Sequence, residues 1–131
     1  MLIKVIQTEE TYSIRQQALY PNDDASKIIL ADDAEGKHLG LFVQGSCVSV
    51  LSLFEKPNGI QLRKFGTLPE LQGNGYGTKL LLHALENSNG RVYLNARVDK
   101  MDFYRKFGFL ETEEAFTRND IDYYVMEKLN K

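Results

Sequence analysis

The sequence lacks the features that mark secreted, membrane-spanning or nucleic-acid-binding proteins. Cys47 is its single cysteine, so no disulfide can form within the chain. Its 16 basic and 18 acidic side chains leave a net charge of −2, which indicates no bulk attraction to nucleic acid or to an anionic membrane. No apolar run approaches the ~20 residues that span a bilayer, and the opening residues turn polar too early for a signal peptide. We therefore expect a cytoplasmic protein without nucleic-acid or membrane partners.

Length and composition favour one compact domain. The chain has 131 residues, of which 43% are hydrophobic and 26% are charged, as in ordinary globular proteins. No linker-like segment divides it, and the glycines show no internal repeat. We expect a single domain over residues 1–131.

The stretch from Leu68 to Thr78 is the most informative part of the sequence. Three alternating glycines stand between a strand pattern that includes Ile60 and Leu62 and a helix pattern that is rich in leucine. Glycine permits positive φ and a close approach to backbone N–H groups, and the start of a helix binds anions. No Lys-Ser or Lys-Thr pair completes a Walker A loop, so nucleotide hydrolysis is disfavoured. Taken alone, the loop is either a phosphate site or a turn that needs glycine.

Two motifs together resemble one protein family. Gln72 to Gly77 is similar to the Q/R-x-x-G-x-G/A signature of the GCN5-related N-acetyltransferases, the GNAT superfamily, and Pro69-Glu70-Leu71 is similar to its usual lead-in. Phe103 to Phe109 resembles the F-Y-x-K-x-G-F segment of the same family, and it follows after one helix and one strand. The order and spacing of the motifs extend the resemblance over nearly the whole chain.

The periodicity and the resemblance agree on the fold class. The resemblance implies an α/β (α+β) fold with a mixed, mostly antiparallel sheet of six or seven strands, flanked by helices and splayed between the fourth and fifth strands. The residue patterns predict helices at 8–20, 75–88 and 99–107. They predict strands at 2–7, 38–44, 47–55, 60–68, 91–96, 109–116 and 121–129.

The resemblance also implies a co-substrate, acetyl-coenzyme A, and no metal. In the family the glycine loop holds the pyrophosphate, and the pantetheine arm pairs with the fourth strand like an added strand. Asn95 on the fifth strand either hydrogen-bonds the pantetheine or is an ordinary polar strand residue. The residues expected to contact coenzyme A are Thr67, Leu68, Gln72, Gly73, Asn74, Gly75, Tyr76, Gly77, Thr78 and Asn95.

Tyr104 is the expected catalytic residue. It matches the family tyrosine that donates a proton or hydrogen bond to the leaving sulfur. Phe103 and Phe107 are interpreted as packing residues. No carboxylate lies in the fourth strand, so the general base stays unassigned; Glu55 and Glu70 are candidates without support, and a water chain is the alternative.

Other polar residues have weaker interpretations. Arg15 on the first helix either binds a carboxylate of the acceptor or is solvated or paired locally, and the second reading is favoured. The acidic segment 22–33 either attracts an amine or keeps a loop hydrated, and residues 27–33 fit a short helix or a strand equally well. His38 is expected to be structural, His83 exposed and Cys47 a packed thiol.

We therefore expect an acetyl-coenzyme A-dependent N-acetyltransferase that transfers the acetyl group directly to a primary amine in a ternary complex. Two alternatives stay open: a non-catalytic acyl-coenzyme A binding or sensing module, and an acyltransferase with another acceptor. The expected partner is a small-molecule or peptide amine. Dimers are common in the family, so a homodimer is a further alternative.

Overall fold

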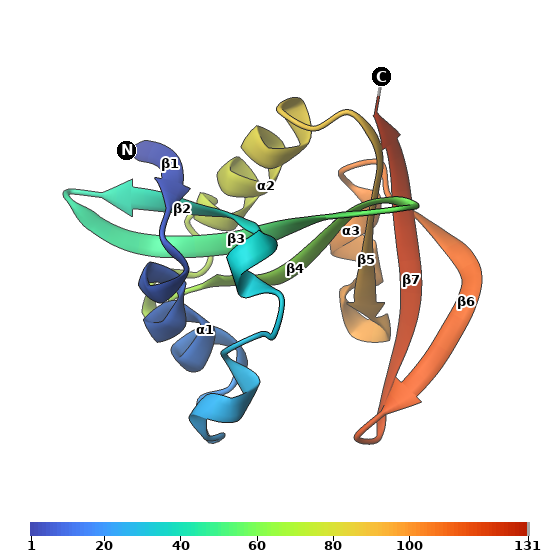
Figure 1. The fold of residues 1–131 in the computed structure, drawn as a ribbon, viewed down its shortest axis with the longest axis horizontal. Helices are drawn as coiled ribbons and strands as arrows, with labels where there is room; N and C mark the ends of the chain where they lie inside the picture. Colours follow the sequence, from blue (N-terminus) through green and yellow to red (C-terminus); the bar gives the residue numbers. More distant parts are fainter. Residues whose placement is uncertain (131) are drawn as a thin grey trace.

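The computed structural model describes residues 1–130 and contains one seven-stranded sheet in the order β1-β2-β3-β4-β5-β7-β6 (Figure 1). Every neighbouring pair is antiparallel except β4 and β5, which are parallel. This confirms the predicted fold class, a mixed and mostly antiparallel sheet. The strands are β1 (Leu2–Ile6), β2 (Lys37–Val43), β3 (Ser46–Lys56), β4 (Gly59–Thr67), β5 (Gly90–Arg97), β6 (Leu110–Arg118) and β7 (Ile121–Asn130).

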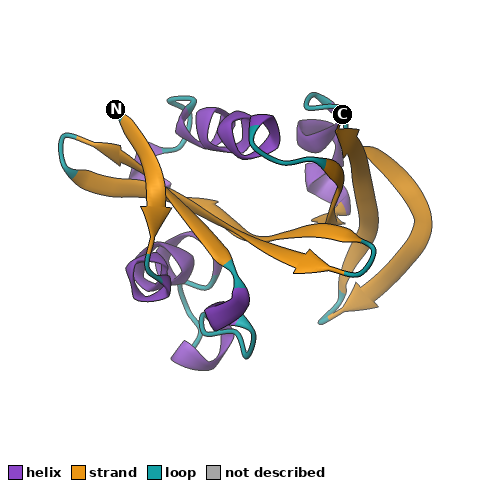
Figure 2. Cartoon of the chain, turned by 45° about the horizontal axis from the view of Figure 1, so that its top comes forward, coloured by secondary structure: helices purple, strands orange, loops and turns teal. Residues whose placement is uncertain are grey.

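Helices cover both faces of the sheet (Figure 2). On one face α1 (Tyr12–Leu19) packs against β4, and on the other α2 (Tyr76–Glu86) and α3 (Met101–Arg105) cover the sheet. Short 3-10 turns connect these elements. They are η1 (Thr8–Thr11), η2 (Ala25–Lys27), η3 (Asp33–Glu35), η4 (Pro69–Leu71) and η5 (Val98–Lys100).

The helix predictions were right in number and wrong at some boundaries. The first helix begins at Tyr12 rather than Thr8, because η1 forms a tighter first turn. Residues 27–33 form neither of the two predicted elements and instead connect η2 to η3. No helix among residues 1–130 is long and apolar enough to cross a membrane.

The main core lies between the sheet and α2. Leu80, Leu81, Ala84 and Leu85 are buried on one face of this helix, as their spacing predicts. Burying each leucine stabilises the fold by roughly 1.5–3 kcal/mol. A smaller cluster of Ile6, Ile14 and Val50 lies under α1, so each helical layer has its own contact with the sheet.

A bulge in β4 changes the face of the sheet to which the Lys64 side chain points. Ser52 pairs with Arg63 and Val50 with Gly66, so two residues of β4 oppose Leu51 alone. Lys64 at the bulge has φ +53°, which is rare for a residue with a Cβ. Simple alternation predicts Lys64 on the side of Leu62; the bulge instead turns it toward α1, where its ammonium lies 4.5 Å from the centroid of the Tyr20 ring.

β4 and β5 separate shortly after they meet. In the part of the chain that the structure describes, their parallel pairing is confined to Ile60 with Val92 and Gln61 with Tyr93. Because a bulge bends its strand, the part of β4 after Gln61 runs away from β5. This confirms the predicted splay between the fourth and fifth strands.

A buried ion pair fastens the α1 side of the molecule. The Arg15 side chain is fully buried, and its two terminal nitrogens donate to the two Asp33 carboxylate oxygens at 2.9 and 3.0 Å. They also donate to the Ile28 carbonyl at 2.6 Å and to Ser52 Oγ at 3.0 Å. Arg15 is therefore paired locally, and it is not solvated.

His38 belongs to the same buried network. Its Nε2 lies 2.9 Å from the Asp33 carbonyl oxygen, which only accepts, so Nε2 carries a proton and donates. Its Nδ1 lies 2.6 Å from Ser52 Oγ. His38 thus holds η3 against β3, which agrees with the structural role expected from the sequence.

Asp33→Asn should destabilise the protein by about 3–5 kcal/mol, because it leaves the buried Arg15 guanidinium without its counter-charge. Urea unfolding of the two proteins measures the difference. Glu111→Gln is the control: Glu111 pairs with Arg105 at the exposed surface, and exposed pairs contribute little. Equal effects of the two substitutions would contradict the anchoring role of Asp33.

The contribution of Asp33 should also depend on pH. Burial by itself raises the pKa of Asp33, but hydrogen bonds from Arg15 and from the Leu30 N–H, with the Arg15 charge, hold this pKa below its ordinary value of 3.8. A lowered folded-state pKa stabilises the protein above the unfolded value, and the gain is lost as the pH falls through the folded value. The stability gap between the wild type and Asp33→Asn should therefore narrow below about pH 4, as urea midpoints at stepped pH would show.

Candidate active site

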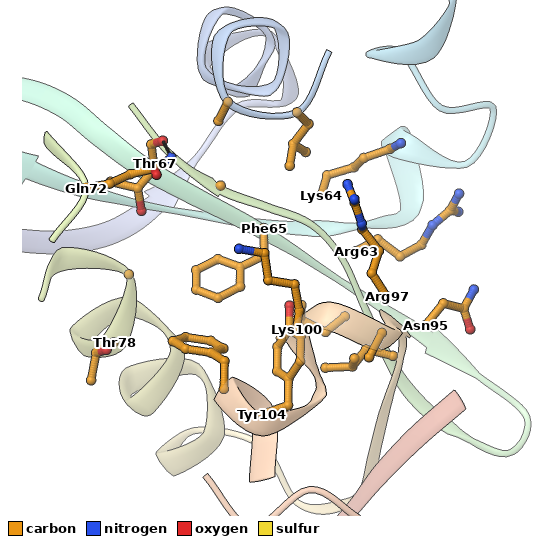
Figure 3. Close-up of a pocket in the computed structure, with 18 of the residues that line it drawn as sticks. Arg63, Lys64, Phe65, Thr67, Gln72, Thr78, Asn95, Arg97, Lys100 and Tyr104 are labelled. Atoms are coloured by element: carbon orange, nitrogen blue, oxygen red, sulfur yellow. Dashed lines mark hydrogen bonds between the residues drawn. The ribbon is translucent and has the colours of Figure 1, made fainter. Parts of the chain in front are cut away.

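A pocket of about 740 Å³ occupies the notch where β4 and β5 separate (Figure 3). Its walls come from β4, β5, the ends of α1 and β6, β7, the start of α2, and α3. Both motifs of the sequence analysis therefore meet in one cavity. Of the residues predicted to bind coenzyme A or to act in catalysis, those lining it are Thr67, Gln72, Gly73, Gly75, Tyr76, Gly77, Thr78, Asn95 and Tyr104.

The glycine loop joins η4 to the start of α2 and has two left-handed residues. Gly73 has φ +88° and Gly75, which caps α2, has φ +82°. A Cβ built on either glycine meets no protein atom within 4 Å. Glycine is therefore required here by backbone conformation, and the space beside the loop is open to a ligand.

The start of α2 supplies the electrostatics of an anion site. The first residues of a helix have N–H groups without an intrahelical acceptor and lie at the positive end of its dipole. At the start of α2, the Lys79 N–H donates a hydrogen bond to the Gly75 carbonyl at 3.1 Å. The N–H groups of residues 76–78 therefore precede the hydrogen-bonded part of the helix, beside the pocket.

Gly77 has a different function from the other two glycines. A Cβ there would lie 3.1 Å from Thr67 Oγ1 and 3.4 Å from Phe65 Cζ. The absence of a side chain therefore lets α2 approach the end of β4 closely. The sequence showed three alike glycines; the structure separates two that shape the loop from one that permits packing.

Two amide side chains hold the loop in shape. Gln72 Nε2 donates to the Thr67 carbonyl at 3.1 Å, and Asn74 Nδ2 donates to the Leu71 carbonyl at 2.9 Å. Gln72 lines the pocket, whereas Asn74 does not. The side chain of Asn74 therefore serves the loop, and only its backbone is a candidate for ligand contact.

Thr67 and Leu68 at the end of β4 are bound differently. Ser49 Oγ donates to the Gly66 carbonyl at 3.1 Å, so the 2.9 Å contact between Thr67 Oγ1 and Ser49 Oγ has Thr67 as donor. The Leu68 N–H donates to the Val48 carbonyl at 2.9 Å, and Leu68 lies outside the pocket lining. The Leu68 N–H is therefore already bound to β3, and the backbone contact of Leu68 with coenzyme A stays a prediction that would have to use its carbonyl.

Tyr104 extends from α3 into the pocket (Figure 3). Its ring makes edge contacts with Phe103 and Phe109, at centroid distances of 5.2 and 5.9 Å. Burial raises the pKa of Tyr104 to about 12. The phenol is therefore protonated throughout the neutral range and can donate a hydrogen bond or a proton, but it cannot act as a base there.

Asn95 lines the pocket from the exposed face of β5. Leu94 and Ala96 point into the core, and Asn95 alternates with them. Arg97 shares this exposed face (Figure 3). Asn95 therefore lies on the side of the sheet away from the start of α2.

The pocket has a strongly basic lining that the sequence analysis did not single out. Among the described residues that line it, none is Asp or Glu. The basic residues lining it are Arg63, Lys64, Arg97, Lys100 and Arg118. They come from four separate elements, so no local charge run signals them.

The candidate bases lie elsewhere. Glu55 and Glu70 are exposed and line no part of the pocket, and His38 is committed to the buried network.

His83 is half-buried rather than exposed. Cys47 packs against the small cluster, and burial raises the pKa of its thiol. Within residues 1–130 no group of three or more His, Cys, Asp or Glu side chains is arranged to hold a metal ion.

Comparisons with known proteins agree with this geometry. The family model "Acetyltransferase (GNAT) domain" matches residues 8–130. An uncharacterised N-acetyltransferase of Bacillus cereus is 29% identical over 107 residues, which are 74% of this chain and 65% of that protein, so the chain spans slightly less than two thirds of this relative.

Two solved structures show the same fold. The crystal structure of Escherichia coli ElaA has a TM-score of 0.80 and 16% identity, and covers 97% of this chain and 98% of its own. A GNAT family acetyltransferase from Elizabethkingia anophelis, solved with acetyl-coenzyme A bound, has a TM-score of 0.78 and 13% identity, and covers 98% and 97%. With the family match over residues 8–130, these findings show that the chain belongs to the GNAT acetyltransferase family.

Proposed function

We propose that the protein is an acetyl-coenzyme A-dependent N-acetyltransferase that acts on a primary amine by direct transfer in a ternary complex. The observation that supports this most strongly is the meeting of the glycine loop at the start of α2 and a partly buried, protonated phenol in one pocket. When bound, acetyl-coenzyme A supplies a thioester, whose acetyl group passes to the amine while the thiol leaves.

The residues present fit this co-substrate. Gly73 and Gly75 leave open space beside backbone N–H groups at the start of α2, which suits a pyrophosphate. Beyond Gln61, β4 has no pairing with β5 in residues 1–130, so its edge is free to pair with the amides of a pantetheine arm. We assign Gly66 and Thr67 to this contact, with the loop holding the phosphates and Asn95 as a further amide beside the notch.

Tyr104 acts on the leaving sulfur in this proposal. Its pKa of about 12 keeps the proton on the phenol at the working pH, so the group is ready to donate to a thiolate. Binding alone needs no donor at this position. The presence of Tyr104 in the pocket therefore favours an enzyme over a module that only senses acyl-coenzyme A.

The first test of this proposal measures coenzyme A release with acetyl-coenzyme A and a broad panel of neutral, anionic and cationic amines. Release that depends on the amine, with a matching N-acetyl product, supports the proposal. Stabilisation by acetyl-coenzyme A without turnover on any amine would instead favour the sensing module.

Tyr104→Phe should lower kcat by about 100-fold or more, because a positioned general acid contributes roughly that much. The affinity for coenzyme A should change little, since only transition-state stabilisation is removed. Steady-state kinetics with calorimetric binding measures both. Because burial raises the pKa of Tyr104 to about 12, wild-type kcat should show no loss from Tyr104 ionisation between pH 8 and about 10.

Gly75→Val should abolish coenzyme A binding, because a branched side chain would occupy the open space of the anion site. Gly45→Val is a matched control: Gly45, in the turn between β2 and β3, also has φ +82° and open space around its Cβ position. Both variants carry the same backbone strain, so a thermal melt should show similar destabilisation. If calorimetry gives both variants the same coenzyme A affinity, the placement of the pyrophosphate at Gly75 is wrong.

A further inference from the structure

We propose that the acetyl acceptor is a small primary amine that also carries an oxyanion, a carboxylate or a phosphate, and that the basic side chains at the α1 side of the pocket bind this anion. The proposal rests on the proposed N-acetyltransferase function and names the substrate class for that same site.

The bulge in β4 brings two adjacent cations to one face of the sheet. In a regular strand Arg63 and Lys64 would point to opposite faces. Here Leu62 lies in the main core and Phe65 contacts Phe103 on the α2 side, with ring centroids 6.3 Å apart. The two residues between them both point toward the α1 side, where Lys64 Nζ contacts the Tyr20 hydroxyl.

Other strands add charge to this region. Arg97 lies on the exposed face of β5 and extends toward Lys64 (Figure 3). Arg118 at the end of β6 lines the same pocket. Beside it, the rings of Phe116 and Tyr123 stack with centroids 5.0 Å apart and form an apolar wall. The site thus combines several cations with a flat aromatic surface.

Carboxylates within residues 1–130 neutralise these cations only in part. Arg97 pairs with Asp99 at 3.3 Å, but both side chains are exposed, and exposed pairs are screened by solvent. Asp32 is the carboxylate bound by Arg63, at 3.4 Å, and it is also bound more closely by Lys56, at 2.9 Å. Within residues 1–130 the Lys64 ammonium contacts the Tyr20 side chain and forms no ion pair with a carboxylate. Since no described lining residue is acidic, the pocket has an excess of positive charge that a bound anion would balance.

The phosphates of the donor do not account for this charge. The anion site at the start of α2 lies on the opposite face of the sheet from Lys64 and Tyr20. Along β4, Lys64 is three residues before Thr67, which is about 10 Å of strand. The basic region therefore lies on the acceptor side of the notch, beyond the end of the strand edge that we assign to pantetheine.

The same charge explains how an amine could react without a carboxylate base. A neighbouring positive charge disfavours an ammonium ion and so lowers the pKa of the acceptor. Polycationic amines would be repelled as whole molecules. An amine that carries its own anion would bind through that anion while its nitrogen stays more easily deprotonated.

The experiment compares matched acceptors with the intact protein and acetyl-coenzyme A. The pairs are L-phenylalanine with L-phenylalaninamide and O-phosphoethanolamine with ethanolamine; spermidine represents polycations. Values of kcat/KM are calculated per unprotonated amine, since the members of a pair differ in amine pKa. At least a tenfold preference for an anionic member supports the proposal, and the two pairs show whether a carboxylate or a phosphate is recognised.

Each result is decisive. Turnover that prefers ethanolamine, the amide or spermidine overturns the proposal but leaves the N-acetyltransferase function standing. Absence of thiol release with every amine in the broad panel contradicts the proposed function itself. Calorimetry without acetyl-coenzyme A adds a readout that is independent of turnover: the preferred acid should bind more tightly than its neutral partner.

Variants locate the anion site. Lys64→Gln and Arg118→Gln should each lower the preference for the anionic acceptor by about tenfold, as expected for a lost charge-assisted hydrogen bond. Lys64→Arg should restore it in part. Lys37→Gln, on the exposed part of β2 outside this pocket, is the control and should leave the preference unchanged. An equal loss of coenzyme A affinity in Lys64→Gln, or an unchanged preference in both pocket variants, would overturn the proposal.

Discussion

The early separation of β4 from β5 is the constraint on which the site depends. The two strands pair at only two positions, and the bulge at Lys64 and Phe65 then bends β4 away. Within residues 1–130, one strand edge is left without a partner in the middle of a sheet, where backbone groups are normally paired. The fold therefore provides a recess that is lined by backbone hydrogen-bonding groups at strand spacing.

The two faces of this recess differ in chemistry. The α2 side has backbone N–H groups, two left-handed glycines and a partly buried phenol. The α1 side has basic side chains and an aromatic pair. A diphosphate suits fixed backbone donors, whereas an acceptor with its own anion suits flexible lysine and arginine side chains. In the function that we propose, the sheet thus separates a donor region from an acceptor region, which meet at the notch.

Rigidity on the acceptor side comes from the buried Arg15 network. Arg15 connects α1 to Asp33, Ile28 and Ser52, so the irregular segment between α1 and β2 is held against β3. The end of α1 contributes Tyr20 to the pocket and contacts Lys64. The sequence alone left open that Arg15 binds a carboxylate of the acceptor, but its guanidinium already binds Asp33. In the structure it positions the wall from which the acceptor side is built.

Several features followed from local sequence patterns. Residue patterns and turn signals together identified all seven strands. β5 shows the expected alternation of buried and less buried residues, whereas β3 is buried over seven consecutive residues, so the turns on either side were needed to delimit it. The leucine spacing after the glycine loop placed α2 and its buried face correctly. Gly73 and Gly75 were recognisable because positive φ strongly favours glycine. The Tyr104 position followed from its motif, and the structure places it in the pocket.

Other features depended on contacts between distant residues. The bulge at Lys64 arises from the register of β4 against β3, which no period in the strand itself reveals. The Arg15–Asp33 pair joins residues 18 positions apart. The Leu68 N–H donates to the carbonyl of Val48 in β3, which is also distant in the sequence. The sequence by itself determined the family, the strand order along the chain and the glycine loop before α2, since these depend on short periodic or conformational patterns. Only the tertiary structure decided which face each β4 side chain uses and gathered the basic residues of separate elements into one pocket, because charge density in a cavity depends on distances in space.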